Sequence, residues 1–397
     1  MAEGLDLQQL IDEALRNSPD LQASRSQVSA AEYRVPQVKT LPDPMLTFGY
    51  QNEGFRRFTY GNPENPNSQG IVSVSQTFPF PGKLVLKGEA ASRESESLGA
   101  SNDALRLKII SRVKELYFEL YATYKNIDLI YESAAHFKVM EDAAIARYST
   151  GKGSQQEVLM AQTEKYMFLE REAKLRQKIE SLNAILNVLV GRPAGAPIGR
   201  PFDRQPENLS YTLDELIQTA NNQSPELKVK DKMIEAAEAR VAFAKKDYYP
   251  DITLTGSYFP RGNNFEDMWS LTAGVTIPIF YRTKQKQAVN EAEASLNAAR
   301  SDKEAARLMI DSTMRENYSM LKAADKLMSL YKEGLIPKGV QDVELALSGY
   351  KTGSVDALTV ITRLHAVIDF ESSYWGQFAE REKAIARIQA LTGMVNQ

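Results

Sequence analysis

Few side chains of this sequence could do catalytic or metal chemistry. It has 397 residues, no cysteine and only two histidines, His136 and His365. Without thiols there is no disulfide, no thiolate metal site and no cysteine nucleophile. Both histidines fall within helical patterns, which favours helix-surface or interface positions over metal ligands or general bases. We therefore expect no catalytic centre, no metal site and no cofactor.

One short run could be mistaken for a phosphate-binding loop, namely Gly151-Lys152-Gly153-Ser154. A P-loop needs an earlier glycine and a preceding strand, and both are missing here. The run is therefore predicted to be a turn. The formal net charge is only −3, which argues against nucleic acid as a partner because a nucleic-acid binder carries a basic excess.

The sequence uses one unit twice. Residues 7–50 match residues 213–256 at a constant offset of 206, and 15 of the 44 pairs are identical. About three identities would be expected by chance. The pairs include two Ser-Pro steps, at Ser18 and Ser224, where the serine is expected to cap a helix that begins at the proline. Two copies are too few for a solenoid, so we expect two pseudo-symmetric halves that line a common surface.

Each copy begins with two predicted helices followed by two predicted strands. Pro36 is unmatched in the second copy, so the first of the longer helices is expected to bend there. In the strands, apolar residues alternate with Thr, Ser and Gly, which is the period of a β-strand. The short helices are expected at about 5–17 and 212–222, the longer ones to about 41 and 247, and the strands around 46–50, 72–78, 252–258 and 269–277.

A long helical hairpin follows the strands of each copy. No proline occurs between Gly82 and Arg192, and apolar residues follow coiled-coil spacing. A helix over about 83–148 would be roughly 100 Å long at 1.5 Å per residue, with a return helix over about 154–190. The second copy repeats this with a break at 349–353, a return helix to about Leu391, and an outgoing helix that Pro337 should kink or split. The apolar seams are Ile110, Val113, Tyr117, Leu120, Tyr124, Ile127 and Tyr131, and in the second copy Ile310, Met314, Leu321, Met328 and Tyr331.

The four predicted strands each have one apolar face, and the sequence supplies no second sheet to cover it. Lipid is the candidate, because outer-membrane strands alternate apolar outward residues with polar inward ones. The alternative is a soluble sheet covered by the protein's own helices, in a coiled-coil scaffold that transports nothing. The residues expected to face lipid are Leu46, Phe48, Val72, Val74, Ile252, Leu254, Trp269, Leu271 and Val275.

Four strands alone would leave two open edges, which cannot exist in hydrocarbon. Closure therefore requires several copies of the chain: three copies of four strands would give twelve, and two copies would give eight. The small polar residues of the inward face favour a water-filled lumen and hence the larger ring.

These features together resemble the TolC-type outer-membrane efflux proteins. The resemblance rests on the double αββα order, the Ser-Pro-Asp/Glu helix starts, the Phe-Pro-Phe-Pro-Gly-Lys-Leu run at 78–84 and the Tyr-x-Thr-Gly turns at 148–151 and 350–353. It covers essentially the whole chain. It implies a mainly α fold with a membrane β-barrel, closed as a homotrimeric tube of 12 strands and 12 helices. The barrel would lie in the outer membrane of a Gram-negative bacterium and the helices would extend into the periplasm.

The resemblance also implies a division of the chain into three parts. Residues 44–80 and 250–281 would form the outer-membrane strands. A periplasmic α-barrel would comprise residues 19–43, 82–192, 224–249 and 282–392. An equatorial belt would comprise residues 1–18, 193–223 and 393–397.

Gating rather than catalysis is the chemistry that the resemblance implies. In the family, two aspartates often follow the tip glycine of the second copy by some six and nine residues and ring the lumen. Thr359 and Thr362 stand there in this sequence, which is a departure from the pattern. Glu157 and Asp356 are nearby acids that could substitute, because three symmetry copies would concentrate negative charge at one constriction; a solvated helix face is the other interpretation. The residues expected at the periplasmic gate and adaptor contact are Tyr148, Thr150, Gly151, Gly153, Glu157, Tyr350, Thr352, Gly353, Asp356, Thr359 and Thr362.

The implied role is that of a passive exit channel in a tripartite efflux system of the RND type. A periplasmic adaptor would open the tip, and an inner-membrane pump would supply energy. The run at 78–84 resembles members that serve heavy-metal cation pumps, while a multidrug or type I secretion duct is the alternative. The 12 methionines are scattered, and Met309, Met314, Met320 and Met328 fall on helix faces where packing explains them better than copper binding. The start of the sequence has no signal-peptide features, which indicates a cytosolic protein or a mature chain with an added methionine.

Overall fold

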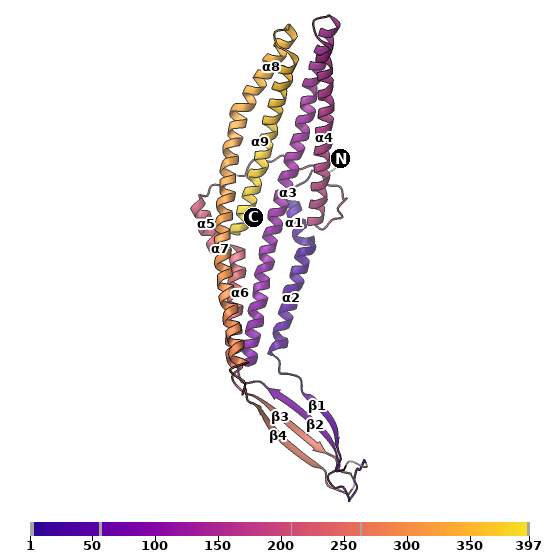
Figure 1. The fold of residues 1–397 in the computed structure, drawn as a ribbon, viewed down its shortest axis with the longest axis vertical. Helices are drawn as coiled ribbons and strands as arrows, with labels where there is room; N and C mark the ends of the chain where they lie inside the picture. Colours follow the sequence, from indigo (N-terminus) through magenta and orange to yellow (C-terminus); the bar gives the residue numbers. More distant parts are fainter. Residues whose placement is uncertain (1–3, 55–57, 208, 263, 395–397) are drawn as a thin grey trace. The chain divides into compact units, whose positions relative to one another are not determined.

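Two copies of the same element order make up the chain, as the repeat predicted. The structure is a computed structural model that describes residues 4–54, 58–207, 209–262 and 264–394. The first copy contains α1 (Leu7–Asn17), α2 (Pro19–Lys39), β1 (Met45–Gln51), β2 (Gln69–Phe78), α3 (Lys83–Ser149) and α4 (Gln155–Leu189) (Figure 1). The second contains α5 (Leu213–Gln223), α6 (Pro225–Lys246), β3 (Asp251–Phe259), β4 (Met268–Thr276), α7 (Gln285–Ser329), the π-helical η1 (Leu330–Leu335), α8 (Ile336–Thr352) and α9 (Ala357–Thr392).

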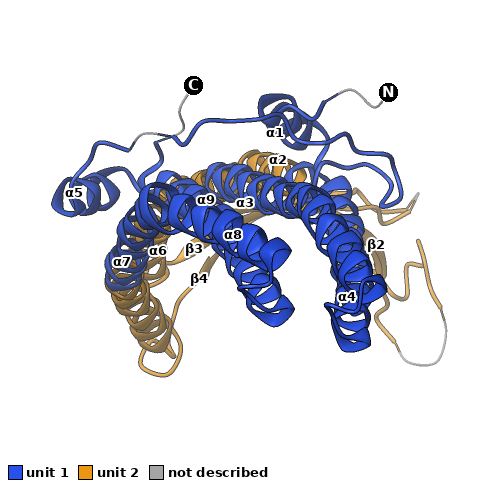
Figure 2. Cartoon of the chain, turned by 90° about the horizontal axis from the view of Figure 1, so that it is seen from above, with its two compact units in different colours: residues 1–23, 102–226, 307–397 blue, residues 24–101, 227–306 orange. Residues whose placement is uncertain are grey.

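The chain forms two compact units, and each unit takes segments from both copies (Figure 2). Unit 1 comprises residues 1–23, 102–226 and 307–397. Unit 2 comprises residues 24–101 and 227–306. Residues 1–3 and 395–397 of the predicted equatorial belt lie outside the described residues.

The core of unit 1 confirms the predicted coiled-coil seam of α3 up to Ile127. Ile110, Val113, Tyr117, Leu120 and Ile127 are buried. They pack with the apolar face of the short helix α1 and with the end of α4 in one cluster. The seam ends earlier than predicted, because Tyr131 is 49% exposed. A second cluster joins the last part of α3 and the first part of α4 to α8 and α9.

The predicted interruption at Pro337 is present. α7 passes into the π-helical turn η1, which ends one residue before Ile336, and the N–H of Ile336 donates to the carbonyl of Tyr331. Proline has no N–H and its ring would meet the carbonyl four residues earlier in a regular helix. The wider turn therefore accommodates the proline without ending the helix.

The Ser-Pro helix starts are only partly as predicted. α2 begins at Pro19 and α6 at Pro225. The hydroxyl of Ser224, however, is buried and has no hydrogen-bond partner among the described residues. The prediction that this serine caps α6 through its side chain is therefore wrong. Its backbone N–H instead ends α5 by donating to the carbonyl of Ala220 at 2.9 Å.

Unit 2 contains the antiparallel sheet, in the order β1-β2-β3-β4. Lys83, the first residue of α3, fastens the sheet to the helices. Its side chain is buried and its Nζ lies 2.9 Å from Oδ1 of Asp251, the first residue of β3. The buried residues of α6 are mainly alanines, and ion pairs join α6 to α3. Examples are Arg93–Glu235 and Lys232–Glu96, at 3.0 and 2.9 Å.

Candidate functional site at the paired helical turns

The first turn joins α3 to α4 and is closed by backbone hydrogen bonds. The N–H of Gly151 donates to the carbonyl of Tyr148 at 3.0 Å, and the N–H of Lys152 donates to the carbonyl of Arg147 at 2.9 Å. This is the Schellman arrangement, which needs a left-handed residue, and Gly151 has φ of +72°. At Gly153 a Cβ atom would lie only 2.9 Å from the Cβ atom of Arg147. Both glycines are therefore required by the backbone.

The second turn joins α8 to α9 in the same way. The N–H of Gly353 donates to the carbonyl of Tyr350 at 3.1 Å, and the N–H of Ser354 donates to the carbonyl of Gly349 at 2.9 Å. Gly353 has φ of +85°. The two Tyr-x-Thr-Gly sequences are thus two copies of one helix terminator.

The helices that leave the two turns begin with equivalent caps. Ser154 and Glu157 form a capping box at the start of α4, in which the hydroxyl accepts from the N–H of Glu157 at 3.3 Å. Asp356 caps α9 by accepting from the N–H of Thr359 at 2.7 Å. At the offset of 202 that relates the two turns, Ser154 corresponds to Asp356 and Glu157 to Thr359. The same third position therefore carries an acid in one copy and threonine in the other.

The three other threonines of the predicted site form local hydrogen bonds. Each hydroxyl donates to a carbonyl three or four residues earlier, in the helix to which the threonine belongs or, for Thr150, in the helix that it directly follows. The distances are 3.0 Å for Thr150, 3.0 Å for Thr352 and 2.8 Å for Thr362. These contacts satisfy the hydroxyls without involving another helix.

The two tyrosines of the site have opposite surroundings although their positions are equivalent. Tyr148 is 51% exposed, whereas Tyr350 is 1% exposed. The Tyr350 hydroxyl donates to Oε2 of Glu157 at 2.7 Å. Burial, together with the Glu157 carboxylate, raises the pKa of Tyr350 to about 12. The phenol is therefore a neutral donor that joins the second turn to the first.

Arg147, which the sequence analysis did not single out, connects the same two turns. Its Nη1 donates to the carbonyl of Tyr350 at 3.0 Å and its Nη2 to the carbonyl of Lys152 at 3.1 Å. The guanidinium lies 5.0 Å from the centre of the Tyr350 ring, and Nε is 3.8 Å from Glu157. A basic residue in the last turn of a helix is common, so the residue type alone did not indicate that Arg147 has a special role. The comparison of the two copies could have indicated it, because the residue equivalent to Arg147 is Gly349.

The acids that were expected near a constriction have partners within the chain. Glu157 accepts from Tyr350 and caps α4. Asp356 is exposed, and the backbone N–H of Thr359 holds its pKa below the ordinary value. That either carboxylate also faces a lumen stays a prediction.

Further along the two hairpins, a half-buried histidine on α9 contacts a glutamate on α4. Nε2 of His365, on α9, is 2.8 Å from Oε2 of Glu164, on α4. Glu164 is 8% exposed, and the rings of Phe137 and Phe168 lie beside the imidazole. His136 is exposed on α3. Neither histidine belongs to a metal-binding group, because no cluster of three potential ligands occurs among the described residues.

The second predicted site is on the sheet of unit 2. Leu46 pairs with Val74, Val74 with Gly256 and Gly256 with Leu271, so a row of directly opposed residues crosses all four strands. Opposed residues, and residues two apart in a strand, lie on the same face. By this register all nine predicted residues lie on one face, which we call the apolar sheet face: Leu46, Phe48, Val72, Val74, Ile252, Leu254, Trp269, Leu271 and Val275.

The apolar sheet face is open to solvent in the single chain. Eight of its nine residues are exposed, from 41% for Leu254 to 78% for Trp269, and Val72 is half-buried. The opposite face carries serine and threonine at most positions, including a hydroxyl pair, Thr77 and Thr253, at 3.0 Å. No helix in the described ranges is both long and apolar enough to traverse a bilayer.

Comparison with known families matches both copies of the unit. The family model described as outer membrane efflux protein matches residues 10–192 and 216–393. The chain belongs to this family. The resemblance drawn from the sequence is confirmed, and the two matched stretches coincide with the two copies of the repeat.

Individual relatives in this family are distant in sequence but similar in length. The chain is 25% identical to the pyoverdine export outer membrane protein OpmQ of Pseudomonas aeruginosa, over 98% of this chain and 84% of the relative. It is 21% identical to the cobalt-zinc-cadmium resistance protein CzcC of Cupriavidus metallidurans, over 98% and 90%. Among solved structures, that of the outer-membrane channel OprN superposes with a TM-score of 0.83 at 16% identity, covering 98% of this chain and 89% of that one. The fold is that of outer-membrane efflux channels, which are not enzymes.

Proposed function

We propose that this outer membrane efflux protein acts as a passive, homotrimeric exit channel in the outer membrane of a Gram-negative bacterium. The observation that carries the proposal is the apolar sheet face: nine residues selected from sequence alternation share one exposed side of the sheet. An exposed apolar surface of this kind indicates an interaction with lipid or another apolar partner. In the scaffold alternative, the protein's own helices would cover this face.

The sheet edges support assembly of several copies. Among the strands that the structure describes, β1 and β4 each have a neighbour on one side only. Unpaired strand edges are not tolerated in hydrocarbon, so the edges must pair with other copies of the chain. Three copies of the four strands give a 12-strand barrel. The serine and threonine face would line its lumen, and that lining favours the trimer over an eight-strand dimer.

The remaining segments follow from this placement of the strands. Residues 44–80 and 250–281 form the barrel. Residues 19–43, 82–192, 224–249 and 282–392 form a periplasmic α-barrel of 12 helices in the trimer. Residues 1–18, 193–223 and 393–397 form the equatorial belt.

The turns at 148–153 and 349–353 form the periplasmic end of the channel, where an adaptor protein binds and opens it. The links from Arg147 and Glu157 to Tyr350 hold the two helical hairpins of one chain together. Opening the tip requires those hairpins to separate, so these links favour the closed arrangement. Energy and selectivity come from an inner-membrane pump of the RND type.

Cargo class is the least constrained part of the proposal. The run at 78–84 favours a heavy-metal cation system, and CzcC is named for metal resistance. OpmQ, which is named for export of pyoverdine, is as similar, so a duct for organic compounds or a type I secretion duct is the alternative. A duct need not bind what it conducts, and the described residues hold no metal cluster.

The test is to purify the full chain and measure its assembly and conductance. A trimer has three times 44.4 kDa, about 133 kDa of protein, and should need detergent to remain monodisperse. In planar bilayers it should form pores, and Glu157→Gln or Asp356→Asn should change cation selectivity or closed-state leak. A monomer that is soluble without detergent and forms no pores would contradict the proposal. Unchanged conductance in both variants would remove only the two acids from the gate.

A further inference from the structure

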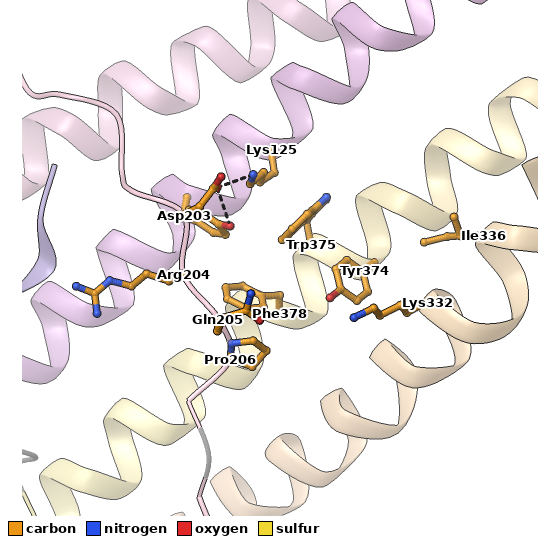
Figure 3. Close-up of a pocket in the computed structure, with 11 residues that line it drawn as sticks. Lys125, Asp203, Arg204, Gln205, Pro206, Lys332, Ile336, Tyr374, Trp375 and Phe378 are labelled. Atoms are coloured by element: carbon orange, nitrogen blue, oxygen red, sulfur yellow. Dashed lines mark hydrogen bonds and ion pairs between the residues drawn. The ribbon is translucent and has the colours of Figure 1, made fainter. Parts of the chain in front are cut away.

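Unit 1 contains a cavity that the channel function does not use. It has a volume of about 500 Å³. The extended segment 203–206 covers one side, and α3, α9 and the junction of η1 with α8 form the others (Figure 3). This volume is in the range of pockets that hold small organic molecules.

The wall contributed by α9 is aromatic. Trp375 contacts Tyr374, Tyr121 and Phe378 edge to face, with ring centroids 5.0, 5.8 and 5.9 Å apart. Such contacts fix the orientation of the rings and leave their remaining surfaces toward the cavity. A flat apolar group can therefore pack here without first ordering the side chains.

Most charges of the wall already have partners. Nζ of Lys125 lies 2.6 Å from Oδ1 of Asp203, and the Tyr121 hydroxyl donates to the same oxygen at 3.2 Å. Burial, together with Asp203, raises the pKa of Tyr121 to about 12. Arg204 pairs with Asp6 at 3.0 Å. These groups are neutralised within the protein and are not available to a ligand.

Lys332 is the exception on this wall. It is exposed, and no carboxylate of the described residues lies within ion-pair distance of its Nζ. Figure 3 shows its side chain extending from the helix toward Tyr374 and the cavity. It belongs to η1, whose wider turn results from Pro337, and π-helical turns are frequent at functional sites. The cavity thus has an aromatic wall with one uncompensated positive charge at its edge.

We propose that this cavity binds a small organic anion that carries an aromatic ring. The ring packs against Trp375 and Tyr374, and the carboxylate or similar group contacts Lys332. Because Asp203 is already paired with Lys125, Lys332 is the charge of this wall that is left to attract the anionic group, and its position sets the orientation of the ligand. A neutral ligand of the same shape would lose the contact with Lys332, and a cationic one would be repelled by it.

The test uses the full chain purified in detergent and three probes of one shape: 4-phenylbutanoate, 4-phenylbutanamide and 4-phenylbutylammonium. The chain has two tryptophans, so in a Trp269→Phe background the emission reports Trp375 alone. We expect a saturable change with the anion, an apparent affinity about two- to fivefold weaker with the amide, and a weaker response still with the cation. The anion's advantage should shrink as salt is added.

Lys332→Gln should remove the preference and bring the affinity for the anion to that for the amide. Lys338→Gln is the matched control, because Lys338 is exposed on α8 but does not line the cavity. Saturation-transfer NMR from the protein to the phenyl ring of 4-phenylbutanoate gives the same comparison without the Trp269 substitution. A linear response that is equal for the three probes, or a preference for the anion that survives Lys332→Gln, would overturn the proposal.

Discussion

Tyr350 shows how one side chain breaks the symmetry of a duplicated unit. Its counterpart Tyr148 is in solvent, whereas Tyr350 is buried and its hydroxyl reaches Glu157 in the other copy. The third residue of α4 is Glu157, which forms the capping box with Ser154. The equivalent third residue of α9 is Thr359, which has no carboxylate. One turn therefore supplies the acceptor and the other the donor.

Replacing Tyr350 with phenylalanine should loosen the contact between the turns. The hydroxyl donates to a charged acceptor, and such hydrogen bonds contribute about 1.5–3 kcal/mol. Amide hydrogen exchange around Gly353 should therefore speed up by about ten- to a hundredfold. Tyr148→Phe, the matched control, should change exchange little because Tyr148 is exposed. Equal effects of the two substitutions would show that the link to Glu157 does not stabilise the turns.

The same hydroxyl predicts a dependence on alkaline pH. The pKa of Tyr350, about 12 in the folded chain, is above the ordinary value of about 10 for tyrosine. A raised pKa means that the contribution to stability is complete below about pH 10 and is lost as the pH rises through about 12. The difference between the 295-nm absorbance titrations of the wild type and Tyr350→Phe should therefore have its midpoint near 12. A midpoint near 10 would contradict the burial of the phenol.

How far the sequence predicted this site depended on whether the interaction is local. Gly151 and Gly353 could be predicted, because a left-handed helix terminator requires glycine within a short stretch of sequence. The partnership of Arg147 and Glu157 with Tyr350 could not, because the residues are about 200 positions apart and basic or acidic residues at helix ends are common.

At the scale of helices, long seams were predicted well, whereas junctions were predicted only in part. The apolar spacing of α3 and α7 is repeated over many turns, so one irregular residue does not hide it. Whether the Ser224 hydroxyl caps α6 depends on the rotamer of one side chain, and the preference of serine for N-cap positions led to the wrong prediction there. The ion pairs that join α3 to α9, between Glu119 and Lys383 and between Glu115 and Arg387, were not predicted either, because the two residues of each pair are far apart in sequence.

Glu382 on α9 provides a test of a different polar contact, between α9 and the segment that precedes α5. It is 1% exposed, and its Oε1 accepts from Arg381 and from the N–H of Glu207, the latter at 3.1 Å. Burial raises the pKa of Glu382 despite the opposing effect of Arg381. A raised pKa means that its contribution to stability is complete below its ordinary pKa and is lost as the pH rises through the folded value.

Glu382→Gln keeps the acceptor oxygen but has no charge to bury. Its thermal midpoint relative to wild type should therefore rise as the pH increases from 4 to 7. Glu382→Ala leaves the donors of Glu207 and Arg381 without this acceptor and should destabilise by about 1–3 kcal/mol across the range. If the thermal midpoints of wild type and Glu382→Gln changed in parallel with pH, the ionised carboxylate of Glu382 would not destabilise the fold.

For the molecule as a whole, the sheet decides between a channel and a scaffold. The sequence predicted which nine residues share a face because alternation in a strand is strictly two-residue. The sequence could not predict what covers this face, because that depends on molecules outside the single chain. The same exposed residues would be a liability for a soluble protein, because exposed apolar sheet faces and open edges promote aggregation.

Leu271→Arg tests the proposed contact with lipid. Leu271 is 71% exposed near the middle of β4, so in water an arginine there would cost little. At the midplane of a bilayer it should cost about 2–4 kcal/mol, measured as the free energy of unfolding by urea from lipid vesicles. Thr272→Arg is the matched control, because it places the same charge one residue along the same strand on the opposite, polar face. We expect a loss of stability and of trimer yield for Leu271→Arg that clearly exceeds that for Thr272→Arg. If the two variants lost equal stability, or if Leu271→Arg inserted and conducted as wild type does, the apolar sheet face would not be in contact with hydrocarbon, and the barrel proposed from it would have to be abandoned.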